Sequence, residues 1–171
     1  DDNLWHNYLT FFLMMSENPF SMTCEKVGAS DGSVNELVEN DFRIFKELFD
    51  YDFGPIEKDL GINCFSQISN YKAIHKKDLM YNKNVSEKVR SLSKKLEAAK
   101  DEKEFFDAVT GFYKDYGVGM FGLNKAFRID DTPQGSFTFR AINNMDTVML
   151  DDLVGYEIQK KKLVDNTEAF V

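Results

Sequence analysis

Residues 85–117 read VSEKVRSLSKKLEAAKDEKEFFDAVTGFYKDYG and contain two helical patterns in succession. In the first, from Val85 to Ala99, apolar side chains recur every three or four residues beneath a face rich in lysine and arginine. In the second, Asp101 provides an N-cap, and a stripe of aromatic side chains ends at Gly117, a residue suited to the left-handed C-cap position. We expect these helices to form an antiparallel hairpin and the chain to be mainly α-helical.

Two more helices are predicted toward the N-terminus. Residues 4–15 place apolar side chains at helical spacing, and the Asn-Pro pair at 18–19 should end that helix, because the residue before a proline avoids helical geometry. We expect a loop over residues 16–33. The sequence Ser-Val-Asn-Glu at 33–36 is a capping box, and the apolar stripe that follows it predicts a helix to about Tyr51.

Shorter elements fill the rest of the predicted bundle. Short helices are expected at 56–60 and 120–127, whereas residues 62–83 mix helical spacing with Asn and Ser and stay ambiguous. Apolar and polar side chains alternate over residues 137–141, which is typical of a strand. We therefore expect a helical bundle with a small β element near residues 136–150, followed by a C-terminal helix.

Composition limits the class of protein. The chain has 171 residues, of which 43% are apolar, with sixteen phenylalanines and seven tyrosines, so it can bury a core. Two cysteines and two histidines, His6 and His75, lack the spacing of a disulfide framework or a metal site, and we expect a reducing cytoplasmic setting. The apolar run at 9–15 is too short to cross a bilayer and lacks the features of a signal peptide.

The net charge of −8 is unevenly distributed. Residues 1–70 carry thirteen acids and four bases, residues 71–100 three acids and nine bases, and residues 101–171 thirteen acids and eight bases. The basic side chains of the middle segment are Lys72, Lys76, Lys77, Lys83, Lys88, Arg90, Lys94, Lys95 and Lys100. We interpret them first as a solvated helix face or an intramolecular complement to the acidic parts. The alternative is a standalone helical scaffold or nucleic-acid-associated module that uses the basic face at 72–100, although an acidic chain disfavours nucleic acid.

The sequence Gly117-Val-Gly119-Met-Phe-Gly122 has the spacing of a dinucleotide-binding loop. Such a loop needs a strand before it, and here a long amphipathic helix precedes it. We therefore interpret Gly117 as a helix C-cap and the other two glycines as parts of a tight turn. The chain also lacks a nucleophile elbow or a serine–histidine–aspartate order, and we predict no catalytic residue in it.

The segment Asp152-Leu-Val-Gly-Tyr-Glu157, followed by Gln-Lys at 159–160 and Asn-Thr-Glu-Ala-Phe at 166–170, resembles part of a known family. It is similar to the lead-in to the nucleotide-binding core of a bacterial family of AAA+ ATPases, the DUF815 group. The resemblance is dense over about residues 108–171 and strongest at 150–170; over residues 1–107 it rests on helical pattern and position alone. In that family a Walker A loop follows shortly afterwards.

The resemblance implies a helical N-terminal domain at 1–128, a short β or linker segment at 129–150, and the incomplete start of an AAA+ nucleotide-binding domain at 151–171. The segment formed by Asp152, Leu153, Val154 and Gly155 would border the adenine of ATP, with Gly155 as the backbone contact. The alternative is an Asp-capped helix start and nothing more.

The chain itself holds no Gly-x-x-x-x-Gly-Lys-Ser/Thr sequence, so we expect it to bind no cofactor and to be no enzyme. ATP and Mg²⁺ are expected only for the full-length protein. We predict a non-catalytic domain that recognises a protein partner or a substrate, binds its own motor domain or helps assembly; oligomerisation of the full-length protein stays open. The C-terminal helix should fray or dock against a neighbouring copy.

Overall fold

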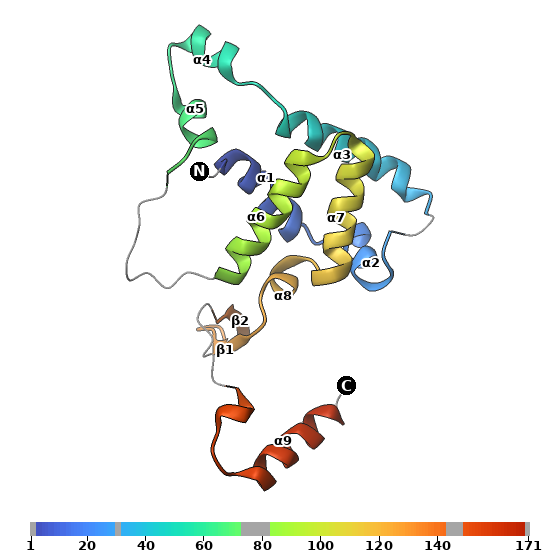
Figure 1. The fold of residues 1–171 in the computed structure, drawn as a ribbon, viewed down its shortest axis with the longest axis vertical. Coiled ribbons are helices and arrows are strands. Elements are labelled where there is room, and N and C mark those ends of the chain that lie inside the picture. Colours follow the sequence, from blue (N-terminus) through green and yellow to red (C-terminus); the bar gives the residue numbers. More distant parts are fainter. Residues whose placement is uncertain (1–2, 30–31, 73–82, 143–148, 170–171) are drawn as a thin grey trace.

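The computed structural model describes residues 3–29, 32–72, 83–142 and 149–169 (Figure 1). Most of the described chain is helical, with one small antiparallel sheet, which confirms the predicted fold class. The elements are α1 (Leu4–Met15), α2 (Pro19–Val27), α3 (Val34–Phe49), α4 (Gly54–Leu60), α5 (Cys64–Ser69), α6 (Lys83–Ala98), α7 (Glu102–Tyr116), α8 (Gly119–Leu123), β1 (Phe127–Asp131), β2 (Phe137–Ala141), the 3₁₀ turn η1 (Leu150–Asp152) and α9 (Glu157–Glu168).

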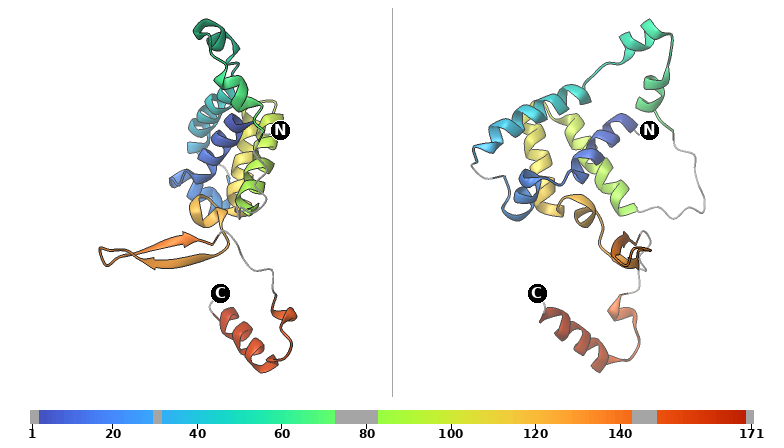
Figure 2. Two further views of the ribbon diagram at one scale, coloured as in Figure 1. Left: turned by 90° about the vertical axis from the view of Figure 1, so that its left-hand side faces the viewer. Right: turned by 180° about the vertical axis from the view of Figure 1, so that it is seen from behind.

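The bundle has two layers of helices. The predicted antiparallel hairpin is present as α6 and α7, which lie side by side in one layer (Figures 1 and 2). Helix α7 packs against α2 and α3, and α6 packs against α1, so these three helices form the second layer. The capping signal that starts α7 is also present, because the Asp101 carboxylate accepts a hydrogen bond from the backbone N–H of Glu104 (2.8 Å).

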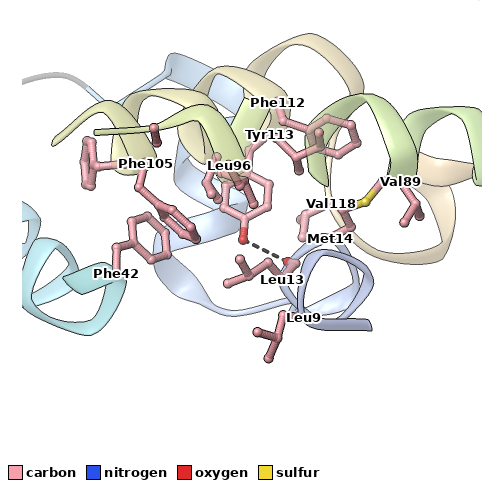
Figure 3. Packing of buried hydrophobic residues seen from close by; sticks show 14 of the residues in the cluster. Leu9, Leu13, Met14, Phe42, Val89, Leu96, Phe105, Phe112, Tyr113 and Val118 are labelled. Carbon is pink, nitrogen blue, oxygen red and sulfur yellow. Dashed lines mark hydrogen bonds between the residues drawn. The ribbon is translucent and has the colours of Figure 1, made fainter. Parts of the chain in front are cut away.

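The core lies between the two layers (Figure 3). Phe105, Leu96, Val109 and Met14 are its most deeply buried large side chains, and burial of each such side chain contributes roughly 1.5–3 kcal/mol. The Tyr113 hydroxyl donates to the Leu13 carbonyl across the layers (2.8 Å). All buried apolar residues of the described chain fall between Leu9 and Leu123, so the core ends with α8.

Helix α2 occupies half of the segment predicted as a loop, so that prediction is wrong for residues 19–27. The Asn18 side chain accepts from the N–H of Ser21 (2.9 Å), and the Ser21 hydroxyl accepts from the N–H of Asn18 (3.0 Å). Pro19 occupies the first helical turn, where its missing N–H is harmless. The Asn-Pro pair therefore starts a second helix as well as following the first.

Helix α3 forms where its apolar stripe predicts it, but its capping box does not form. Ser33 has helical backbone angles and caps no N–H of the described chain with its side chain. Gly61 has a φ of 64° and ends α4 in the left-handed conformation. Helix α5 lies within the ambiguous segment 62–83, of which residues 73–82 lie outside the described chain.

The sheet is a two-stranded hairpin of β1 and β2, with Ile129 opposite Phe139. Strand β1 begins earlier in the chain than the predicted β element near 136–150, and residues 143–148 of that prediction lie outside the described chain. Helix α9 lies apart from the bundle in Figures 1 and 2. No helix in the described ranges is long and apolar enough to cross a membrane.

Candidate functional site

The segment predicted to border adenine forms one continuous exposed loop between η1 and α9. Asp152 belongs to η1, and its carboxylate accepts a hydrogen bond from the N–H of Met149 (2.7 Å), which closes that turn. Leu153 is exposed, and Val154 is 95% exposed. Helix α9 begins five residues after Asp152, at Glu157. The residue that precedes α9 is Tyr156, and no side chain of the described chain caps this helix, so the expected capping of α9 by an aspartate is wrong, whereas the role of the segment beside adenine stays a prediction.

The backbone reverses sharply at the end of this loop. Gly155 has a φ of 84° and Tyr156 a φ of 60°, so two successive residues adopt left-handed geometry. Glycine adopts such angles freely, whereas a residue with a Cβ loses roughly 1–2 kcal/mol there. A Cβ added to Gly155 would meet no atom of the described chain within 4 Å, so its conformation, and not a lack of space, favours glycine at this position.

The glycine motif at residues 117–122 is filled by the protein's own atoms. A Cβ on Gly122 would lie 2.3 Å from the carbonyl carbon of Gly117, and a Cβ on Gly119 would lie 1.8 Å from Oε1 of Glu17. The Glu25 carboxylate accepts a hydrogen bond from the N–H of Val118 (3.1 Å). Two carboxylates at the turn disfavour a phosphate by charge and by space, which supports the structural interpretation of this motif.

Lys88, one of the basic side chains of α6, also forms a hydrogen bond with this turn. Its ammonium group donates to the carbonyl of Gly122 (2.9 Å) and lies 4.8 Å from the centre of the Tyr116 ring. Burial, and secondarily the charge of Lys125, lower the pKa of Lys88. Lys88 thus stabilises the end of the bundle and is withdrawn from any basic surface.

The remaining basic segment is only partly described. Lys94, Lys95 and Lys100 are exposed on or next to α6. His75, Lys76, Lys77 and Tyr81 lie outside the described residues. Lys72 and Arg90 are exposed as well, so the described part of the segment is a solvated basic face, and its use for nucleic acid stays an untested alternative.

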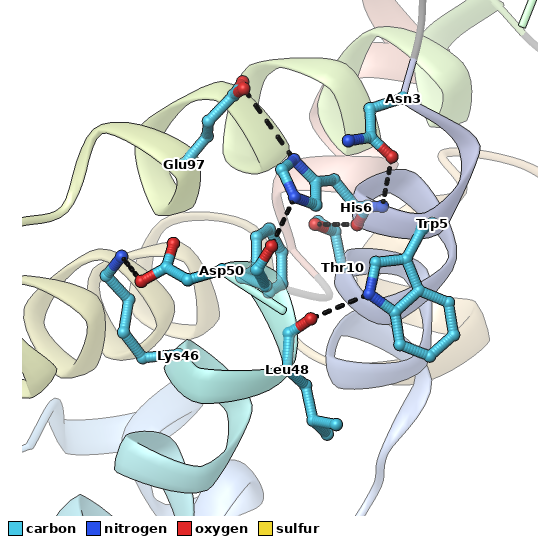
Figure 4. A network of polar contacts seen from close by, with 9 residues as sticks. Asn3, Trp5, His6, Thr10, Lys46, Leu48, Asp50 and Glu97 are labelled. Carbon is cyan, nitrogen blue, oxygen red and sulfur yellow. Dashed lines mark hydrogen bonds and ion pairs between the residues drawn. The ribbon is translucent and has the colours of Figure 1, made fainter. Parts of the chain in front are cut away.

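His6 links α1 to the end of α3 and so has a structural role (Figure 4). Its Nε2 is 2.7 Å from the carbonyl oxygen of Phe49 at the end of α3, and its ring stacks on the Phe49 ring with centroids 4.6 Å apart. Its Nδ1 lies 3.9 Å from a carboxylate oxygen of Glu97, too far for a hydrogen bond. Within the described chain no cluster of three His, Cys, Asp or Glu side chains could hold a metal ion.

Glu57 is a buried carboxylate that the sequence analysis missed. It accepts hydrogen bonds from the hydroxyl of Ser66 and from the backbone N–H of Ser66 (2.8 Å), and these bonds lower the pKa of Glu57. The contact joins α4 to α5. Its role is structural, and the short helix α5 gave no sequence signal strong enough to reveal it.

An exposed apolar surface is the second feature that the sequence analysis missed. The α1–α3 face is the set of outward-pointing side chains Tyr8, Phe12 and Met15 of α1 and Leu37, Ile44 and Leu48 of α3. Tyr8, Phe12 and Met15 belong to the apolar spacing that predicts α1, and such spacing ordinarily marks the core side of a helix. One signal could have revealed them: α1 is apolar on nearly its whole circumference, whereas a helix on the surface of a bundle needs only one apolar side.

Comparison with known proteins concerns the C-terminal part of the chain. Residues 123–171 match the sequence model of a family described as "Protein of unknown function (DUF815)". The C-terminal segment is similar to DUF815 proteins. We call residues 123–171 the DUF815-like segment; it contains the hairpin, the predicted adenine-side loop and α9. The match begins later than the resemblance seen from the sequence, which extended to about residue 108.

A search of curated proteins and a search of solved structures each found no match. The DUF815-like segment begins at Leu123, which is also the last buried residue of the helical core. The fold and the family comparison therefore divide the chain at the same residue.

Proposed function

We propose that residues 4–123 are a non-catalytic, partner-binding module and that the DUF815-like segment leads into the nucleotide-binding core of an AAA+ ATPase. The observation that carries this proposal is the common boundary at Leu123. Among the described residues no buried apolar side chain follows Leu123, and those of 149–169 include no buried residue of any kind. A segment with exposed apolar side chains such as Val154 and Leu163 needs a further surface to cover it.

The loop at 152–155 has properties that suit the edge of an adenine ring. Val154 offers an exposed apolar side chain, and left-handed Gly155 presents its backbone without a covering Cβ. The phosphates and Mg²⁺ would be held by residues that follow this segment in the full-length protein, because residues 1–171 contain no Walker A sequence. The chain's own contribution would be to position the base.

Nucleotide binding tests the proposal. Isothermal titration calorimetry with Mg-ATP should detect no binding to residues 1–171 and clear binding to the chain extended through the natural sequence that follows. In the extended chain, Gly155→Val should weaken ATP binding by about tenfold or more, which is about 1.4 kcal/mol.

Gly135→Val in the hairpin turn is the matched control. Gly135 also has a left-handed φ (76°), and a Cβ there meets no atom of the described chain within 4 Å, as at Gly155. This variant should leave ATP affinity unchanged. Tight binding by residues 1–171, or no binding by either form, would contradict the proposal.

A further inference from the structure

We propose that the α1–α3 face binds an amphipathic helix that carries lysine or arginine beside its apolar stripe. This inference rests on the proposed partner-binding role of residues 4–123 and assigns that role a surface and a class of partner.

The spacing of the exposed side chains suits a helical partner. Tyr8, Phe12 and Met15 follow each other at intervals of four and three residues, so they form one stripe on α1. Tyr8 is 60% exposed and Phe12 is 53% exposed. On α3, Ile44 and Leu48 are four residues apart and form a second stripe. Apolar anchors spaced in this way are what a docked helix needs.

The two stripes belong to one rigid surface. The indole N–H of Trp5 donates to the carbonyl of Leu48 (2.8 Å), and the rings of Phe12 and Phe45 stack with centroids 6.3 Å apart (Figure 4 shows the first contact). Side chains on the opposite side of α1, among them Leu9 and Leu13, are buried in the core. The face therefore lies on the side of α1 away from the core, with Tyr8 beside Val89 and Arg90 of α6, and helix α1 cannot bury the face by rotating without exposing its core side.

The charges that α3 places beside the face are acidic in sum, whereas Arg90 of α6 lies near Tyr8 at the other edge of the face. Residues 4–15 contain no Asp, Glu, Lys or Arg. On α3 both cations are paired within the helix, Arg43 with Glu47 and Lys46 with Asp50.

Glu36 and Asp41 of the same helix are exposed and have no ion pair within the described part of the chain. An acidic border attracts a cationic partner and repels a second copy of the same face or an anionic membrane.

The test uses residues 1–171 and synthetic helical peptides. The probe is a fluorescently labelled peptide of about 18 residues, five helical turns, with leucine on one stripe and lysine elsewhere. A twin peptide has glutamate in place of lysine. Fluorescence anisotropy should show that the lysine peptide binds at least about tenfold more tightly than the glutamate peptide.

Variants of the face locate the site. Phe12→Ser and Leu48→Ser should each weaken binding of the lysine peptide by about tenfold, as expected at the centre of an interface. Asp41→Lys should weaken it about threefold and reduce its salt dependence. Ile129→Ser on β1 is the control, because Ile129 is 62% exposed and lies outside the face; it should bind as the unaltered chain does. Circular dichroism checks that each variant is folded.

Other occupants give distinct results that overturn the inference. Equal binding of the two peptides, or face variants that bind like Ile129→Ser, would refute it. Sedimentation that shows self-association lost in Phe12→Ser would assign the face to a second copy, and Phe12-dependent binding to phosphatidylglycerol vesicles would assign it to a membrane. If the lysine peptide does not bind but the extended chain binds ATP, only this inference fails. If the peptide binds and ATP does not, only the nucleotide part of the proposed function fails.

Discussion

Replacing Gly122 and Gly111 separately with alanine should change stability in opposite directions. A Cβ on Gly122 would lie 2.3 Å from the carbonyl carbon and 2.7 Å from the carbonyl oxygen of Gly117. Carbon atoms in good contact are about 3.5–4.0 Å apart, so the two backbone segments must separate by about 1 Å. Both clashing atoms are main-chain atoms, which cannot move away by a rotamer change.

The cost has two parts. Overpacking of this kind costs roughly 1–3 kcal/mol. The movement also displaces the Gly122 carbonyl that accepts from the ammonium of Lys88, a bond to a charged group that contributes roughly 1.5–3 kcal/mol when fully lost. Allowing for partial relaxation, we expect Gly122→Ala to lower the free energy of unfolding by about 3 kcal/mol. At about 2–4 °C per kcal/mol for a chain of this size, the melting temperature should fall by about 6–12 °C.

Gly111 provides the matched control. It lies in the middle of α7, and a Cβ there would meet no atom within 4 Å in the described part of the chain, the helix's own backbone aside. Alanine is favoured over glycine in a helix interior, so Gly111→Ala should raise the free energy of unfolding by roughly 0.5–1 kcal/mol. Guanidinium unfolding followed by circular dichroism measures both variants. The reasoning is refuted if Gly122→Ala is as stable as the unaltered chain, or if both variants shift stability in the same direction.

Two further predictions concern buried polar groups. Tyr113→Phe removes a hydrogen bond to a main-chain carbonyl and should lower the free energy of unfolding by about 1 kcal/mol at neutral pH. Because burial raises the pKa of Tyr113, the unaltered chain should lose stability as pH rises above about 10. Urea unfolding at pH 8 and pH 11 should show a smaller loss of stability in the variant. Glu57→Gln should weaken the contact between α4 and α5. Hydrogen bonds from Ser66 lower the pKa of Glu57, so the contribution of the carboxylate is present at neutral pH and is lost as pH falls through that lowered value. The protection of the Ser66 amide, relative to an unstructured peptide at the same pH, should therefore fall in acid in the unaltered chain but not in the variant.

Local signals predicted most of the helices. Helices α6 and α7 follow from caps and stripes that lie within a few residues of each other, such as Asp101 at the start of α7. Helix α2 was missed because an Asn-Pro pair is compatible both with the end of one helix and with the start of the next. The choice depends on the reciprocal hydrogen bonds of Asn18 and Ser21, which only the folded geometry shows.

The candidate surfaces were harder to predict because periodicity does not say what a stripe faces. Tyr8 and Phe12 have the spacing of core residues, and their exposure follows from how α1 is rotated against α6 and the core. The family resemblance implied Gly155 as a backbone contact, which stays a prediction, and the structure shows that its backbone is left-handed. Nothing in the sequence predicted the same geometry for Tyr156, because a residue with a Cβ disfavours it.

The division of the chain at Leu123 is tested most directly by amide hydrogen exchange of residues 1–171 in dilute solution. Amides of α7 should be protected by about 10⁴-fold or more, because they open only with the whole core. Amides of α9 should exchange within about tenfold of the rate of an unstructured peptide, since none of the side chains in Glu157–Glu168 is buried. Protection of α9 equal to that of α7 would contradict the account, because it would mean that the DUF815-like segment shares the core of the helical module.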